Sequence, residues 1–332
     1  MKIGVVLAAL AGLLGAAYLI FYVGFDAVFG AALSVGWGGF ALLWLYGAAN
    51  FVMLGIGWML LVPPYNWRSA TTFCWGRAVR DSAGDMLPFS QIGGMVIGAR
   101  AVILRGVKRA TSFGSTVVDV TMEMIAQIAF IILGLIILTM HLPGAASRVP
   151  MVETTVVGIL VAVLAAGAFF IVQRRGFSFL EKMAERFLPA AAVHAAAVDK
   201  AINSIHAAPI RMTGAFFIHF LGWLSSAFGT WLALELIGAP ITFADTIAVE
   251  SLLCAARSAA VFVPGAIGIQ EAGYAVMMPL FGLTPEIGIA VSLLKRAREI
   301  AVGAPVLLSW QIAEGGHAAT ARARKKLPEI KG

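Results

Sequence analysis

The stretch that decides the fold is Pro-Gly-Ala-Ile-Gly-Ile-Gln-Glu, residues 264–271, which lies inside a long apolar region. Pro264 has no backbone N–H to donate and clashes with the preceding helical turn. Gly265 and Gly268 each lower helix propensity by about 1 kcal/mol. The stretch therefore predicts an unwound turn at 263–268, in a part of the chain where a membrane helix would normally be regular.

The residues after this turn predict a short helix that begins near Ile269. The first N–H groups of a helix have no intrahelical partner and carry partial positive charge, so they can receive an anion. Glu271 falls in the first turn of this helix, where the helix dipole stabilises a carboxylate. The same carboxylate can also hold a cationic partner, so the break is a candidate polar site.

The composition around this stretch is that of a helical membrane protein. Of 332 residues, 60% are hydrophobic and 12% are charged, whereas soluble domains carry roughly 25% charged residues. The apolar runs are unbroken, unlike the alternating segments of about 10 residues in outer-membrane barrels. We therefore expect an all-α, polytopic transmembrane bundle. Full apolar windows lie at 3–24, 38–62, 116–140, 152–172, 212–238 and 286–310.

Two further apolar stretches, 84–104 and 243–283, are interrupted by glycine, proline and charge. Irregular backbone at membrane depth is tolerated only where protein or a wet cavity receives it. The sequence therefore predicts six full spans plus two broken, re-entrant segments, or about eight crossings if the broken stretches span. Apolar interhelical loops are the alternative interpretation of both stretches.

The distribution of charge predicts the orientation. The net charge is +7, and the basic residues gather in segments 63–80 and 173–211 and in the C-terminal tail. This is the pattern of the positive-inside rule rather than of nucleic-acid binding. We expect a multi-pass protein of the bacterial inner (cytoplasmic) membrane with both termini in the cytoplasm. The run after Met1 is interpreted as an uncleaved first span, because it is too long for a signal peptide.

The order of the windows repeats. Residues 1–150 give span, span, broken segment, span, and residues 151–332 give the same order from the opposite side of the membrane. This pattern indicates an inverted-topology repeat, which transporters use to place a site near the midplane. The second repeat also carries segment 173–211, which we interpret as a cytoplasmic amphipathic segment on the membrane surface.

Two motifs in the broken stretches resemble a known family. Leu-Pro-x(4)-Gly-Gly-x(5)-Arg runs from Leu87 to Arg100, and Val-Pro-Gly-x-Ile-Gly-x-x-Glu runs from Val263 to Glu271. The pair resembles the flippase-like superfamily that contains the membrane part of lysylphosphatidylglycerol synthases. The chain looks like a stand-alone member, similar to the hopanoid-biosynthesis-associated subgroup. The resemblance implies movement of a lipid between leaflets, without aminoacyl transfer.

Ionisable residues at membrane depth are costly and usually face the bundle interior or a cavity. On this ground, and on the polarity of the broken stretches, we select candidate substrate-binding residues and backbone-break residues. The substrate-binding candidates are Arg100, Arg257, Arg298, Glu271, Glu250, Glu123, Ser90 and Gln91. The break candidates are Pro88, Gly93, Gly94, Pro264, Gly265 and Gly268.

The partners of these charges can also be anticipated. Glu250 and Arg257 share one helical face, which predicts an ion pair, or a phosphate contact by Arg257. In the cluster 295–299, we expect Arg298 to point inward with its acidic neighbour, toward Glu271. The alternative is that the last helix begins after this cluster. Asp119 is either solvated at a helix end or turned inward with its neighbours on one helical face.

Function is open between three hypotheses. The leading one is a lipid transporter or flippase that moves an anionic or isoprenoid-type lipid and is not an enzyme. A membrane-embedded lipid-modifying enzyme and an accessory scaffold of lipid (hopanoid) biosynthesis are the alternatives. No nucleotide motif or metal-ligand spacing is present, so we expect no cofactor. The expected partners are membrane lipids and no nucleic acid, with a second copy of the chain and lipid-biosynthesis enzymes as further candidates.

Overall fold

The computed structural model describes residues 33–87, 90–141, 189–239, 241–259 and 268–326, and these parts are helical. Three of their helices are long and apolar enough to cross a membrane, which confirms the windows at 38–62, 116–140 and 212–238. The windows at 3–24 and 152–172 lie outside the described residues. The three helices are α3 (Gly36–Leu60), α6 (Arg109–His141) and α9 (Pro209–Leu236).

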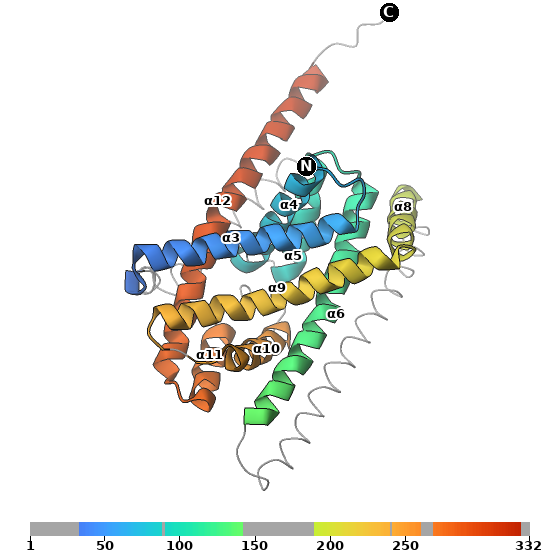
Figure 1. Ribbon diagram of the computed structural model, residues 1–332. Coiled ribbons are helices and arrows are strands. Elements are labelled where there is room, and N and C mark those ends of the chain that lie inside the picture. The colour runs from blue at the N-terminus through green and yellow to red at the C-terminus, as the bar shows by residue number, and fades with distance from the viewer. Residues whose placement is uncertain (1–32, 88–89, 142–188, 240, 260–267, 327–332) are drawn as a thin grey trace, which may run out of the picture.

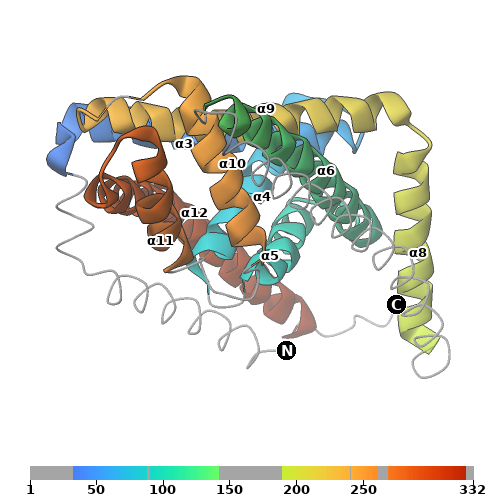
Figure 2. The same cartoon turned by 90° about the horizontal axis from the view of Figure 1, so that it is seen from below.

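Helices α3 and α9 lie side by side along one face of the molecule, and α4, α5, α6, α10, α11 and α12 lie behind them (Figures 1 and 2). Their contact is close because Gly57 of α3 faces Ile218 of α9, and Gly222 of α9 faces Leu54 of α3. Small residues let helix backbones approach in a membrane, where burial of apolar surface gives little net attraction between helices. Helices α3 and α9 therefore form one layer, against which α4, α6, α10 and α12 pack.

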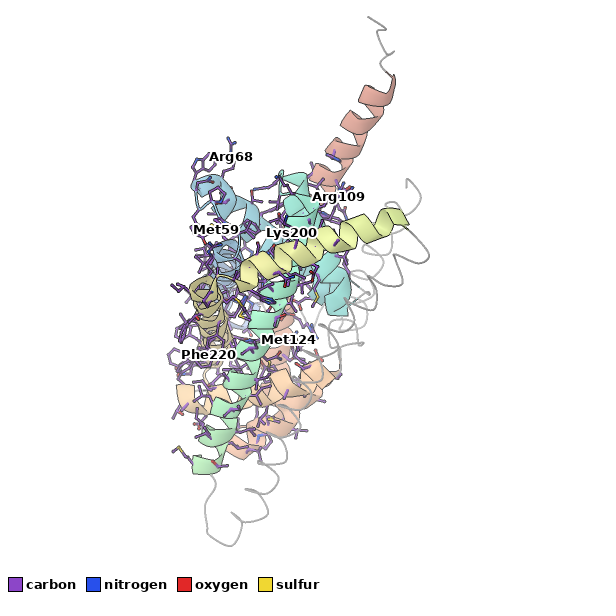
Figure 3. The ribbon with its side chains drawn as sticks, turned by 90° about the vertical axis from the view of Figure 1, so that its right-hand side faces the viewer. Met59, Arg68, Arg109, Met124, Lys200 and Phe220 are labelled. Atoms are coloured by element: carbon purple, nitrogen blue, oxygen red, sulfur yellow. The ribbon has the colours of Figure 1, made fainter. Side chains whose placement is uncertain are left out.

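Helix α8 (Pro189–His206) is the described end of segment 173–211. Figure 3 shows α8, which carries Lys200, crossing α6. Ile205 is buried against Val118 and Met122 of α6, whereas Asp199 and Lys200 are exposed. The expected amphipathic helix is therefore present in this part of the segment, and its place on a membrane surface stays a prediction.

The first broken stretch, 84–104, contains the end of α4 (Trp67–Met86) and the whole of α5 (Ser90–Leu104), and these two helices pack against each other as a hairpin. Helix α4 begins in a capping box, in which the Asn66 side chain accepts from the Ser69 N–H at 2.8 Å. Gly94 of α5 lies so close to α4 that an added Cβ would be 2.5 Å from the Arg80 carbonyl oxygen. Helix α4 thus ends at Met86, and α5 begins at Ser90.

This hairpin corrects two expectations. Segment 63–80 is not a basic cytoplasmic loop, because most of it is helix α4 and the side chains of Arg77 and Arg80 are buried. Gly93 and Gly94 do not break the chain, because both lie inside α5. The absence of a Cβ at Gly94 serves the close packing of the hairpin instead. Pro88 lies outside the described residues.

The second broken stretch also forms two packed helices, α10 (Phe243–Ala259) and α11 (Ile269–Met277), followed by the 3-10 turn η2 (Met278–Phe281). Helix α11 begins at Ile269, as the sequence predicts, and Gly268 precedes it with φ +81°. That left-handed conformation favours glycine. Pro264 and Gly265 lie outside the described residues.

Helix α12 (Pro285–Lys326) runs for 42 residues past both hairpins, so the charges at 295–299 lie within the helix and the alternative of a later start is wrong. Pro305 inside α12 leaves the carbonyl of Ala301 without its usual donor. The indole Nε1 of Trp44 on α3 donates to that carbonyl at 3.2 Å. A side chain from another helix thus replaces the hydrogen bond that proline cannot donate.

The last helix of each half packs on the hairpin and the long helix of the other half. Helix α6 packs against α10 and α9, and α12 packs against α4 and α3. Each hairpin is therefore held between a helix of its own half and the last helix of the opposite half, as Figure 1 shows. This arrangement brings the C-terminal end of α4 close to the C-terminal end of α10.

Candidate functional site

The two hairpins meet through an ion pair. Asp85, in the last turn of α4, lies 3.6 Å from Arg257, in the last turn of α10, and their side chains are 23% and 28% exposed. Of the two expectations for Arg257, the ion pair with Glu250 is wrong, and the phosphate contact stays a prediction. Residues seven positions apart in a helix are separated by about 10 Å along its axis. Carboxylates from other helices are closer to Arg257.

Glu250 instead belongs to a buried polar cluster with Lys295 of α12. Lys295 Nζ lies 2.9 Å from Glu250 Oε1, and it also donates to Thr230 at 2.9 Å and to Tyr274 at 2.6 Å. Thr230 donates to the same carboxylate at 2.6 Å, and Tyr274 also donates to it. The Glu250 carboxylate therefore has hydrogen-bond donors from three other helices. The cluster joins α9, α10, α11 and α12.

Glu271 holds the start of α11 and reaches α12. Its Oε2 accepts from the N–H of Gly268 at 2.7 Å, so it caps its own helix. Its Oε1 lies 3.4 Å from Arg296 Nε and 3.3 Å from Ser292 Oγ. The expected cation partner of Glu271 is therefore present, but it is Arg296 rather than Arg298. Arg296 also contacts Glu299 at 3.3 Å, within the same helix.

Arg298 lies on the side of α12 that faces α3 and α9. A Cβ added to Gly47 of α3 or to Gly229 of α9 would each lie 3.3 Å from the Arg298 side chain. Within the described parts of the chain, Arg298 forms no hydrogen bond or ion pair. Its side chain is half-buried. It is therefore an interior guanidinium that retains its capacity to bind an anion.

Arg100 lies elsewhere. Its guanidinium makes two bonds to Glu314, from Nε at 3.0 Å and from Nη2 at 2.7 Å, so α5 is held to the second part of α12. Arg100 is thus neutralised by a partner that sequence reasoning did not name. The side chains of Ser90 and Gln91 lie outside the described residues, and their predicted role stays untested.

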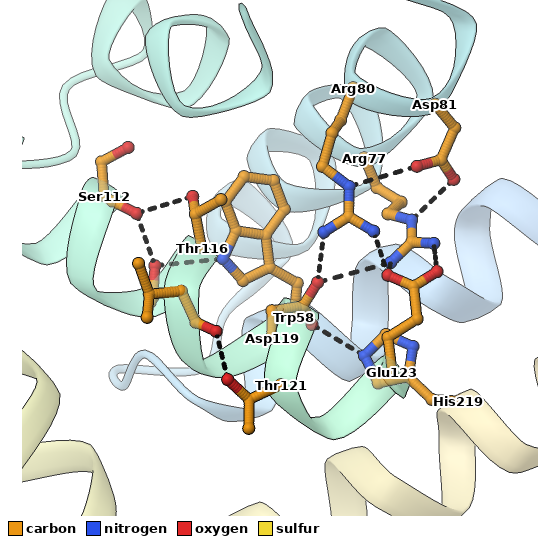
Figure 4. Close-up of polar contacts among 12 residues, drawn as sticks. Trp58, Arg77, Arg80, Asp81, Ser112, Thr116, Asp119, Thr121, Glu123 and His219 are labelled. Carbon is orange, nitrogen blue, oxygen red and sulfur yellow. Dashed lines mark hydrogen bonds and ion pairs between the residues drawn. The ribbon is translucent and has the colours of Figure 1, made fainter. Parts of the chain in front are cut away.

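A further cluster of charges lies between α4, α6 and α9 (Figure 4). Asp119 of α6 accepts from Arg77 at 3.3 Å and from Arg80 at 2.7 Å, and its other oxygen lies 2.9 Å from His219 Nε2. The side chain of Asp119 is 0% exposed. The interpretation of Asp119 as a solvated helix end is therefore wrong, and the alternative that it turns inward holds.

The rest of this cluster is equally close. Glu123 binds both guanidinium groups, and its nearest contact with Arg77 is 2.5 Å. Asp81 contacts Arg77 at 2.7 Å and Arg80 at 3.1 Å. We name these six residues the arginine cluster: Arg77, Arg80, Asp81, Asp119, Glu123 and His219. Sequence analysis selected Glu123 but missed Arg77 and Arg80 as interior residues.

The comparison with known proteins rests on a family model. The model described as the lysylphosphatidylglycerol synthase TM region matches residues 3–306, nearly the whole chain. No curated protein and no solved structure matches the chain. The match agrees with the resemblance carried by the two motifs and with a membrane protein related to lipid handling. The chain therefore belongs to the family of the lysylphosphatidylglycerol synthase TM region.

Proposed function

We propose that this protein moves an anionic lipid between the two leaflets of the bacterial inner membrane and leaves the lipid chemically unchanged. The observation that carries the proposal is Arg298, an interior guanidinium with no ion pair or hydrogen bond within the described residues. A guanidinium presents a planar fork of donors that matches a phosphate group. An anionic headgroup is therefore the natural partner of Arg298.

Arg257 is the second headgroup contact in this proposal. Its ion pair with Asp85 is long, at 3.6 Å, and both side chains are partly exposed. Glu299 interacts electrostatically with both Arg257 and Arg298, so the two arginines belong to one charged region. Lys295 and Arg296 already contact carboxylates and would keep the region in place.

The packing supports an inverted repeat of 1–150 and 151–332. The helices of the two repeats correspond in pairs: α3 to α9, the first hairpin to the second, and α6 to α12. Corresponding helices have corresponding packing partners. In transporters with inverted repeats, the substrate site lies between the repeats near the midplane. The hairpin tips at Asp85 and Arg257 would occupy that place, with both chain termini in the cytoplasm.

The test is a lipid-movement assay. Purified protein is reconstituted into liposomes that contain phosphatidylglycerol with a headgroup label, and the labelled fraction accessible from outside is followed in time. We expect Arg298→Gln to slow the movement at least tenfold, because a charged hydrogen bond contributes about 1.5–3 kcal/mol. Arg100→Gln is the matched control, since Arg100 is bound to Glu314.

Two results would contradict the proposal. One is equal movement in the Arg298→Gln variant and in the unaltered protein. The other is a labelled lipid of altered mass after incubation, which would indicate an enzyme instead. Variant folding is checked by size-exclusion profile and thermal midpoint, so that a slow variant is not an unfolded one.

A further inference from the structure

His219 is a fully enclosed imidazole with one bound nitrogen and one free nitrogen. Its side chain is 0% exposed, and Nε2 lies 2.9 Å from Asp119 Oδ1. Nδ1 is buried and, among the described residues, has no hydrogen-bond partner. A neutral imidazole has one N–H and one lone pair. With the N–H of Nε2 donated to Asp119, the lone pair of Nδ1 is left as an acceptor for a proton.

The charges that face His219 favour that proton. Asp119 and Glu123 come from α6, and Arg77, Arg80 and Asp81 come from α4. With its carboxylates ionised, the arginine cluster holds two positive charges against three negative ones. An unbalanced charge away from water is costly. A proton on His219 brings the cluster to neutrality without moving any helix.

The other neighbours of α9 do not change this balance. Helix α3 presents Gly57 to the imidazole, with an added Cβ 3.8 Å from Nε2. The charged groups of α10 and α12 meet α9 at Ser226, Gly229 and Thr230, about 10–16 Å further along the helix. The charges of α8 at 199–200 are exposed. The arginine cluster is therefore the electrostatic surrounding of His219.

Two carboxylates of the cluster are partly exposed. Glu123 and Asp81 are 22% and 19% exposed, whereas His219 and Asp119 are fully enclosed. The two partly exposed carboxylates therefore lie at the edge of the cluster, and the imidazole lies at its closed end.

The position of Asp119 connects the proton to the hairpin. One oxygen of Asp119 faces His219, and the other accepts from Arg77 and Arg80 of α4. A positive imidazole competes with the two guanidinium groups for this carboxylate. The charge on His219 therefore affects how strongly α6 holds α4, the helix whose last turn carries Asp85 in the proposed lipid path.

We propose that His219 and Asp119 form a proton-binding site, and that the proton held at Nδ1 of His219 is the ion that drives lipid movement. The role in coupling rests on the proposed function, whereas the proton site itself does not. The binding step adds one proton to one lone pair, and the positive charge is balanced by the excess carboxylate of the cluster.

The first experiment observes the proton directly. The protein is labelled with ¹⁵N in its histidines, and the ring nitrogens are followed by NMR from about pH 5 to pH 9. The His219 signal is identified by its loss in His219→Gln. We expect both ring nitrogens to become protonated within this range.

The second experiment measures coupling in the liposome assay, with a pH gradient imposed in either direction. We expect the gradient to change the rate of lipid movement several-fold in the unaltered protein and to have no effect in His219→Gln. Glutamine retains a donor toward Asp119 and does not titrate, so the bundle stays folded. His206→Gln, at an exposed position on α8, is the matched control.

The outcomes separate the two proposals. A His219 ring that keeps one protonation state across the range overturns the proton site. Lipid movement that ignores the gradient overturns the coupling and leaves the transport function in place. If no lipid moves at any pH, the transport function fails, and the NMR titration alone decides whether the site binds a proton.

Discussion

The two hairpins have the same order of elements but are held differently. The first, α4 with α5, is joined along its length through glycines, and its first helix carries two arginines that are 2% and 5% exposed. The second, α10 with α11, has a return helix of only 9 residues, and the buried contacts of Glu250 and Tyr274 with Lys295 hold it to α12. Near its end, however, Arg257 has only a contact of 3.6 Å with Asp85, and both side chains are partly exposed. The difference indicates that the second hairpin is held firmly at Glu250 and more weakly at Arg257, whereas the first is held firmly along α4.

The largest expected effect on stability is at the arginine cluster, and it tests the difference between the two hairpins. Arg77→Met leaves Asp81, Asp119 and Glu123 with a single guanidinium, so we expect the free energy of unfolding to fall by about 3–5 kcal/mol. Arg257→Met in the second hairpin removes a partly exposed contact and should cost about 1 kcal/mol or less. Denaturant unfolding in detergent measures both free energies, and equal losses would contradict the weaker hold on α10 at Arg257.

A second pair of variants sharpens the comparison at the glycines. In Gly94→Ala the new Cβ would lie 2.5 Å from a carbonyl oxygen of α4, and we expect a net loss of about 1–3 kcal/mol. In Gly273→Ala the new Cβ meets the end of the Leu253 side chain, which can shift more easily than the backbone carbonyl that faces Gly94. The gain in helix propensity of about 1 kcal/mol should then offset the contact. Thermal midpoints that fall alike in both variants would argue against the difference.

The smallest expected effect concerns the connection between the halves. Trp44→Phe removes the indole N–H that donates to the carbonyl of Ala301. This carbonyl has no helical donor because Pro305 lies four residues later. We expect a loss of about 1 kcal/mol, the usual net contribution of one hydrogen bond. Trp37→Phe, at an exposed indole at the start of α3, is the control. An unchanged thermal midpoint in Trp44→Phe would mean that water serves the carbonyl equally well.

Hydropathy and helix-breaking residues predicted much of the fold. The windows located α3, α6 and α9, and the glycine at 268 located the start of α11. The same scale failed for α4, because it counts each arginine as if it were in water. Arg77 and Arg80 can be buried because Asp119 and Glu123 come from a helix more than 30 residues later. Nothing local in the sequence shows that pairing.

The candidate site was predicted in part for a related reason. Sequence spacing suggested partners along one helix, as for Glu250 with Arg257, whereas the structure pairs these residues with Lys295 and Asp85 of other helices. Interior charges in a bundle are satisfied mainly across helices, since neighbours on one face are a turn or more apart. The identity of the polar residues was therefore easier to predict than their partners.

The two glycines beside Arg298 have a consequence for what can enter. A methyl group on either Gly47 or Gly229 would stand 3.3 Å from the arginine side chain and press it aside. Gly47 and Gly229 thus leave room for the Arg298 side chain between α3 and α9, beside the hydrogen bond from Tyr46 to Ser225 that joins the two helices. Lipids that bind between α3 and α9 would therefore be selected by the size of the headgroup as well as by its charge.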